Sequence, residues 1–164
     1  MSVPTSKDQR AVLAVIAALE ADADIVSAFK IQDPALGDSR EYRIRRQDMG
    51  NAQDDGPRLC ITTFRVYETV DSLGEAEGTF YLDVKAAAVI YVAHDPLSDR
   101  ENEKDVIVNL TGLVRDKLHA LAYLDGAPWY DIQMGSPSTQ FDSSESFARS
   151  VTVFDISCRY RNNE

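Results

Sequence analysis

The chain has 164 residues, of which 44% are hydrophobic and 27% charged, a composition typical of one globular domain. Acidic residues outnumber basic ones by 27 to 17, and the formal charge is -10 at pH 7. This excess argues against broad binding to nucleic acids or anionic membranes, because a phosphate-binding surface needs a dense basic patch. The longest apolar stretches, AVLAVIAAL and AAAVIYVA, are shorter than the roughly 20 residues that span a bilayer. The N-terminus shows no signal-peptide pattern, so we expect a cytosolic chain without membrane contact.

The first helix is predicted to begin near Ser6, because Ser6 and Gln9 match a capping box. Apolar residues recur at helical spacing over residues 12–19, and the stripe resumes over residues 25–29 after the polar stretch 21–24. We therefore expect one helix with a joint, or two short helices, that bury a single face.

Residues 31–57 differ in character, because they are rich in Asp, Gly, Pro and Arg. So long a stretch without a clear element is uncommon inside a compact domain. We interpret it as an extended arm with room for one short strand at about residues 42–46. The arm carries four arginines in an otherwise acidic chain, Arg40, Arg43, Arg45 and Arg46. They form either a solvated loop or a segment that docks on an acidic surface.

Two strands are predicted next, at residues 58–70 and 79–93, because both stretches are rich in β-branched and aromatic residues. The second alternates with a period of two, so its even-numbered residues from Phe80 to Val92 share one face and Tyr81, Asp83 and Lys85 share the other. The acidic residues 71–78 between them predict the flexible tip of a long hairpin.

A second capping box, from Ser98 to Glu101, predicts the start of another helix. Its apolar stripe consists of Val106, Ile107, Leu110, Leu113, Val114, Leu118 and Leu121. A turn at residues 125–128, a strand at about 129–134 and a Ser-rich loop follow, and a closing strand begins near Phe147. In the closing strand the alternation predicts an apolar face and a polar face: Phe154, Ile156, Cys158 and Tyr160 toward the helices, and Asp155, Arg159 and Arg161 on the outside.

The predicted order is helix, β-hairpin, helix, β-hairpin. This order favours an α+β fold in which two helices pack on a largely antiparallel four-stranded sheet. We treat residues 1–164 as a single domain.

No sequence motif of a known catalytic or phosphate-binding mechanism is present, since GxxxxGK[ST], GxGxxG, HExxH and GxSxG are all missing. His94 and His119 are interpreted as structural, and Cys60 and Cys158 as reduced core thiols. The acidic residues from Asp95 to Asp105 lack the spacing of a calcium loop. We therefore predict no enzyme activity, no catalytic residue, no cofactor and no metal.

Several features of the chain together resemble the tail terminator, or tail completion, proteins of tailed bacteriophages. They are the order of the elements, the strand that starts at Gly56–Ile61, the helix that begins with Asp95–Glu101 directly after an aromatic-rich strand, and the closing strand Arg149–Tyr160. The similarity covers about residues 6–161 and lies in pattern and order rather than in diagnostic residues.

The resemblance implies a structural virion protein that forms a ring, typically hexameric, on the head-proximal end of the tail tube. Such a ring stops tube polymerisation and provides the joint to the neck or connector. Its partners would be other copies of the chain, the tail tube protein, the neck or connector protein and, in a contractile tail, the sheath protein. DNA would pass through the ring without specific binding, and assembly would take place in the host cytoplasm.

Under this resemblance, residues 38–48 and 68–79 are predicted to face a neighbouring subunit or the tube. The candidate residues are Arg40, Arg43, Arg45, Arg46, Glu68, Asp71, Glu75 and Glu77, together with Asp155, Arg159 and Arg161 of the closing strand. Alternatives are another neck or head-completion ring, the cap of a phage-like injection system, a small-ligand-binding α+β module, and an enzyme that uses His94 and Asp95.

Overall fold

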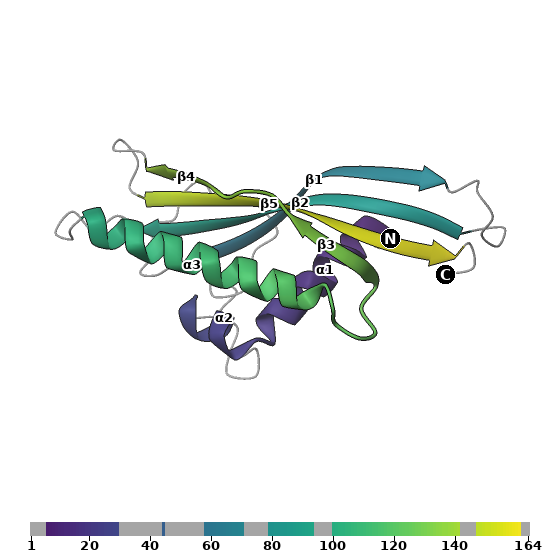
Figure 1. Cartoon of the computed structure of the whole chain (residues 1–164), viewed down its shortest axis with the longest axis horizontal. Coiled ribbons are helices and arrows are strands. Elements are labelled where there is room, and N and C mark those ends of the chain that lie inside the picture. The colour runs from purple at the N-terminus through teal and green to yellow at the C-terminus, as the bar shows by residue number, and fades with distance from the viewer. Residues whose placement is uncertain are drawn as a thin grey trace, which may run out of the picture.

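The computed structural model describes residues 6–29, 44, 58–70, 79–93, 100–141 and 147–161. Its elements are α1 (Lys7–Glu20), α2 (Ala23–Ala28), β1 (Arg58–Val70), β2 (Thr79–Ala93), α3 (Arg100–Leu121), β3 (Trp129–Met134), β4 (Ser138–Phe141) and β5 (Phe147–Arg161). The three helices lie on one face of an antiparallel sheet, which confirms the predicted α+β class (Figure 1). The first predicted helix is the pair α1 and α2.

The sheet has the strand order β1-β2-β5-β3, and β4 also pairs with β5. β2 and β5 pair along their whole length, from Thr79 opposite Arg161 to Ala93 opposite Phe147. This central pair joins the two predicted hairpins into one sheet.

The short strand β4 corrects the prediction of a Ser-rich loop in this region. β5 is much longer than β3, so β3 pairs with residues 154–158 of β5 while β4 pairs with residues 148–151. Between the two, the N–H of Gly135 donates to the carbonyl of Val153 at 2.8 Å. A Cβ on residue 135 would lie 3.3 Å from that carbonyl oxygen, so glycine permits the close approach.

The main core lies between the helices and one face of the sheet. Alternate residues of β2 from Leu82 to Val92 are buried there, as are Phe154, Ile156 and Cys158 of β5. These are the faces that the period-two alternation predicts. Cys158 is a buried thiol, and the side chain of Cys60 is not among the described ones.

The helix ends differ from the predictions in detail. Ser6 is the N-cap residue of α1, but its side chain makes no capping hydrogen bond, so the predicted capping box is wrong. In α3, Val106 is 36% exposed and is not part of the buried stripe. Thr111 of the same helix is buried, although it is polar. Its Oγ1 lies 2.7 Å from the carbonyl of Ile107 and 2.8 Å from Oγ of Ser150 in β5.

The face of the sheet away from the helices has a second buried apolar cluster. It consists of Ala87, Val89 and Tyr91, with the partly buried Val151 packed against them. The second half of β2 is therefore buried on both faces, as the unbroken apolar run AAAVIYV allows. The first half of β2 is half-buried and polar on this face, at Asp83 and Lys85.

Ile44 is the one described residue of the predicted arm. It is buried in the main core, outside any strand, and its N–H donates to Oε1 of Glu20 at 3.2 Å. The predicted strand at 42–46, the hairpin tip 71–78 and the residues around His94 and Ser98 otherwise lie outside the described residues. None of the helices in the described part of the chain combines the length and apolarity that crossing a membrane requires.

Candidate interaction surface

One end of the sheet extends past the helices. Figure 1 shows that β1, β2 and β5 run beyond the helical layer at the end where β5 finishes. At this end of the sheet Val70 of β1 pairs with Phe80 of β2, and Phe80 pairs with Tyr160 of β5. The three helices therefore do not reach this end of the sheet.

Six polar side chains form two rows across the face away from the helices. The register sets Asp83, Ser157 and Asp131 in one row, and Lys85, Asp155 and Gln133 in the next. We call this set the polar strip. It holds three carboxylates and one ammonium group, so its net charge is negative.

Hydrogen bonds and an ion pair order the polar strip. Ser157 Oγ donates to Oδ1 of Asp83 at 2.7 Å, and Gln133 Nε2 donates to Oδ2 of Asp131 at 2.8 Å. Lys85 Nζ lies 3.3 Å from Oδ1 of Asp155, and the two side chains are 33% and 39% exposed. Such exposed pairs contribute little to stability, but they fix the positions of charges that a partner would meet.

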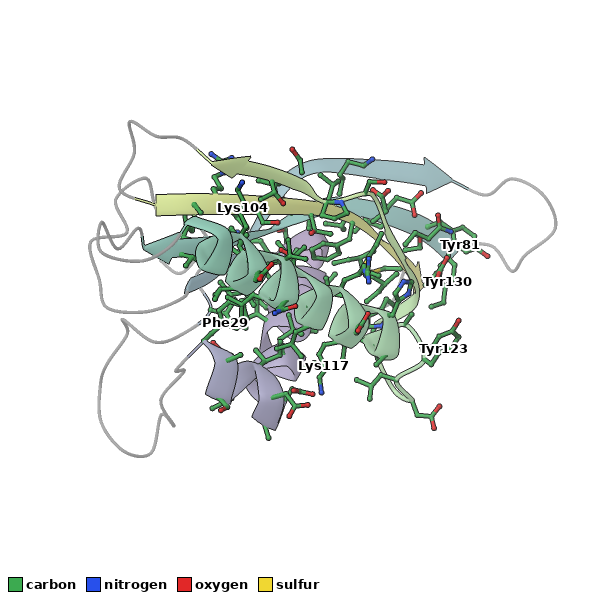
Figure 2. The ribbon with its side chains drawn as sticks, turned by 60° about the vertical axis from the view of Figure 1, so that its left-hand side comes forward. Phe29, Tyr81, Lys104, Lys117, Tyr123 and Tyr130 are labelled. Atoms are coloured by element: carbon green, nitrogen blue, oxygen red, sulfur yellow. The ribbon has the colours of Figure 1, made fainter. Side chains whose placement is uncertain are left out.

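Three exposed side chains, Tyr123, Leu124 and Tyr130, and the half-buried Tyr81 lie at the same end of the molecule. The rings of Tyr81 and Tyr130 meet edge to face, with centroids 6.1 Å apart and an interplanar angle of 89°. Tyr130 is 56% exposed, Tyr123 88% and Leu124 49%. Figure 2 shows the three tyrosines at one end of the ribbon. We call these four residues the tyrosine patch.

The turn between α3 and β3 positions the tyrosine patch. Trp129 is buried, and its Nε1 donates to the carbonyl of Leu121 at 2.8 Å. This bond holds the start of β3 against the end of α3. Gly126 has φ 77°, a left-handed conformation that glycine adopts without strain. In the sequence, Tyr123 and Leu124 precede the buried Trp129 and Tyr130 follows it. The turn and the first residues of β3 therefore carry three of the four residues of the patch.

The predicted interface residues fall into three groups. Asp155 is in the polar strip. In the described backbone, Glu68 lies opposite Leu82, Arg159 opposite Tyr81 and Arg161 opposite Thr79. The side chains of Glu68, Arg159 and Arg161 are not described, and Arg40, Arg43, Arg45, Arg46, Asp71, Glu75 and Glu77 lie outside the described residues.

No protein-family model and no curated protein matches the sequence. The candidate surface therefore depends on geometry and chemistry alone. In the described ranges, no three His, Cys, Asp or Glu side chains are grouped so that they could hold a metal ion.

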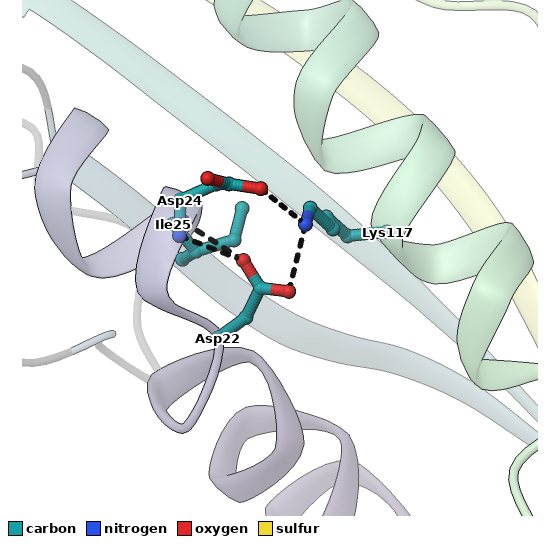
Figure 3. Close-up of polar contacts among 4 residues, drawn as sticks. All are labelled: Asp22, Asp24, Ile25 and Lys117. Carbon is teal, nitrogen blue, oxygen red and sulfur yellow. Dashed lines mark hydrogen bonds and ion pairs between the residues drawn. The ribbon is translucent and has the colours of Figure 1, made fainter.

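A separate ion-pair cluster joins α2 to α3 (Figure 3). Lys117 Nζ lies 2.8 Å from Oδ2 of Asp22 and 2.6 Å from Oδ2 of Asp24. Oδ1 of Asp22 accepts from the N–H groups of Asp24 and Ile25 at 3.0 and 3.1 Å, so it caps α2. Since every partner belongs to the helical layer, this cluster links α2 to α3 and stabilises the fold.

The electrostatics of this cluster agree with a structural role. Burial alone would raise the pKa of Asp22, but the hydrogen bond from Lys117 and those from the backbone N–H groups lower it on balance. Hydrogen bonds to Asp22 and then Asp24 raise the pKa of Lys117. Both groups are therefore held in their charged forms.

Proposed function

We propose that this protein is a structural subunit of a phage-type tail, which forms a closed ring on the head-proximal end of the tail tube. The ring stops tube polymerisation and joins the tube to the neck. The observation that carries the proposal is the direction of the strands at the two edges of the sheet.

Every neighbouring pair of strands in the sheet is antiparallel. β1 and β5 therefore run one way, while β2, β3 and β4 run the other way. Among the described strands, β1 forms one edge, and β3 with β4 forms the other. The two edges thus run in opposite directions.

Edges of this kind suit a head-to-tail ring. If a second copy is placed beside the first by rotation about an axis along the strands, its β3 and β4 edge meets β1 of the first copy as an antiparallel neighbour. The same contact then repeats from copy to copy. A repeated contact between two different surfaces closes into a ring when the rotation closes.

The charge of the chain is compatible with a ring through which DNA passes. The formal charge is -10, and the polar strip places part of this negative charge on the face of the sheet away from the helices. Because a negative lining repels phosphate groups, DNA would move through such a ring without sticking.

The test combines particle mass with tube growth. Native mass spectrometry should find a ring of six copies of 18.2 kDa, which is about 109 kDa. In a reconstituted polymerisation of the tail tube protein, substoichiometric amounts of the ring should stop elongation, because only tube ends need to be capped. Tubes that continue to grow in the presence of excess ring would contradict the proposal.

A further inference from the structure

We infer that the tyrosine patch binds the arginine-rich segment 40–46 of a second copy of the chain. This inference rests on the proposed ring, because it assigns one contact between neighbouring subunits. The patch consists of Tyr81, Tyr123, Leu124 and Tyr130, as defined above.

The exposed apolar surface is concentrated in the tyrosine patch. The large hydrophobic side chains that are exposed in the described part of the chain are Tyr123, Leu124 and Tyr130 in the patch, and Val106 and Val108 on α3. Scattered exposed residues such as Val108 are normal on a protein surface, whereas a group of them marks an interaction site. Tyrosine is enriched in such sites because its ring is both large and polar at one end.

Among the described side chains, two acidic neighbours of the patch favour cations. Asp125 follows Leu124 and is exposed, and Asp131 follows Tyr130 and is half-buried. Aromatic faces attract guanidinium groups, which stack on them, and carboxylates bind the same groups through charged hydrogen bonds. Tyrosine rings bordered by aspartates are therefore suited to arginine side chains.

The chain itself contains a matching segment. Arg40, Arg43, Arg45 and Arg46 lie within seven residues, although acidic residues exceed basic ones by 27 to 17 in the whole chain. Ile44 of this segment is buried in the core and bonded to Glu20, the last residue of α1. Ile44, at the centre of the four arginines in the sequence, is thus fixed to its own chain.

A head-to-tail ring needs two different surfaces on each subunit that fit each other. The tyrosine patch and the arginine-rich segment are two such surfaces, one aromatic and acidic, the other basic. A second copy is therefore the occupant that this pair of surfaces favours.

The experiment is a titration of a fluorescently labelled peptide of residues 38–48, DSREYRIRRQD, with the full chain, at a concentration where sedimentation shows monomers. We expect binding by fluorescence anisotropy. The Tyr123→Ser/Tyr130→Ser variant should raise the Kd at least about fourfold, since each exposed ring contributes roughly a two- to fivefold factor to arginine binding. Val108→Ser, at a site on α3 that is 59% exposed, should leave the Kd unchanged.

Two further reagents decide between occupants. A peptide in which all four arginines are replaced by glutamine should bind at least about tenfold more weakly than the original peptide. Equal binding of the two peptides would overturn the inference. Equal Kd values of the wild type and the double tyrosine variant for the original peptide would overturn it too. A chain whose own Arg40, Arg43, Arg45 and Arg46 are changed to glutamine should bind the original peptide like the wild type. Binding about tenfold tighter than that would show that each chain occupies its own patch, which also overturns it.

The outcome is separable from that of the proposed function. If the double tyrosine variant still forms rings that stop tube growth and the peptide does not bind the wild type, the inference fails and the proposed function stands. If the peptide binds as expected but the chain does not stop tube growth, the proposed function fails and the contact remains.

Discussion

Replacing Thr111 with valine is expected to destabilise the protein, because it leaves the hydroxyl of Ser150 in the core without its partner. Both side chains are buried between α3 and β5. Thr111 Oγ1 lies 2.7 Å from the carbonyl of Ile107, to which it donates, and 2.8 Å from Oγ of Ser150, from which it can accept. Valine has nearly the shape of threonine, so the substitution removes the hydrogen bonds without opening a cavity.

The expected loss in the free energy of unfolding depends on which hydroxyl loses its hydrogen-bond partner. In Thr111→Val the buried Ser150 hydroxyl is unsatisfied, at a cost of about 1–3 kcal/mol in the free energy of unfolding. In Ser150→Ala the hydroxyl of Thr111 keeps its bond to Ile107, so the cost is about 0.5–1.5 kcal/mol. The double variant leaves neither hydroxyl behind, so it should be less destabilised than the sum of the single variants, by about 1 kcal/mol.

The measurement is a double-mutant cycle from urea denaturation, followed by circular dichroism and by the fluorescence of Trp129, the single tryptophan of the chain. Val108→Thr, on the exposed side of the same helix, serves as the control and should change the free energy of unfolding by less than about 0.5 kcal/mol. Single-variant effects that add within about 0.3–0.5 kcal/mol would show that the two hydroxyls are not coupled, and would refute the reasoning.

Substitutions at three other positions give distinct expectations. Asp22→Ala should lower the free energy of unfolding by about 1 kcal/mol in a urea titration, while Asp22→Asn, which can still cap α2, should cost less. Since the folded pKa of Asp22 is below the ordinary value of 3.8 for an aspartate, the stability from its charge is present above that pH and is lost as the pH falls through the folded pKa. The difference between the wild type and Asp22→Asn should therefore disappear in an acid titration, and a difference that persists at low pH would argue against the charge. Phe154→Ala should cost about 3–5 kcal/mol by thermal or urea unfolding, because it opens a cavity in the core; a cost below about 1 kcal/mol would contradict close packing there. Gly135→Ala should speed amide hydrogen exchange at residue 135, because the added Cβ crowds the carbonyl of Val153, which accepts the N–H of residue 135. An unchanged exchange rate would show that the strand shifts to accept the Cβ and keeps this hydrogen bond.

The faces of the long strands could be predicted from the sequence because they depend on local alternation. Residues 82–92 of β2 and 154–158 of β5 bury the side chains that the period-two pattern selects. The pairing of β2 with β5 could not be predicted in this way. It joins residues that are far apart in the chain, such as Val84 and Ile156, and no local pattern specifies which strands become neighbours.

The misassigned elements were those that depend on tertiary contacts. β4 contains only one large apolar residue in STQF, and it forms because β5 extends past β3 and leaves backbone groups to be paired. The sequence predicts only a polar interruption at residues 21–24, whereas in the structure Asp22 caps α2 and forms an ion pair with Lys117. Ser6 matches a capping pattern yet makes no capping bond, which shows that the pattern allows a hydrogen bond without requiring it.

Charge, on which the predicted interface residues depend, does not predict the tyrosine patch. Charged side chains are exposed on almost every protein surface, so their presence distinguishes an interface poorly. A more specific signal was present in AYLDGAPWY, residues 122–130, where two large apolar residues stand in a turn beside Gly126 and Pro128. Turns at the surface are usually polar, so Tyr123 and Leu124 there are exposed at a cost in solvation. An exposed aromatic residue in a surface turn, next to the buried Trp129, is therefore a better starting point for locating a partner than the acidic and basic runs of this chain.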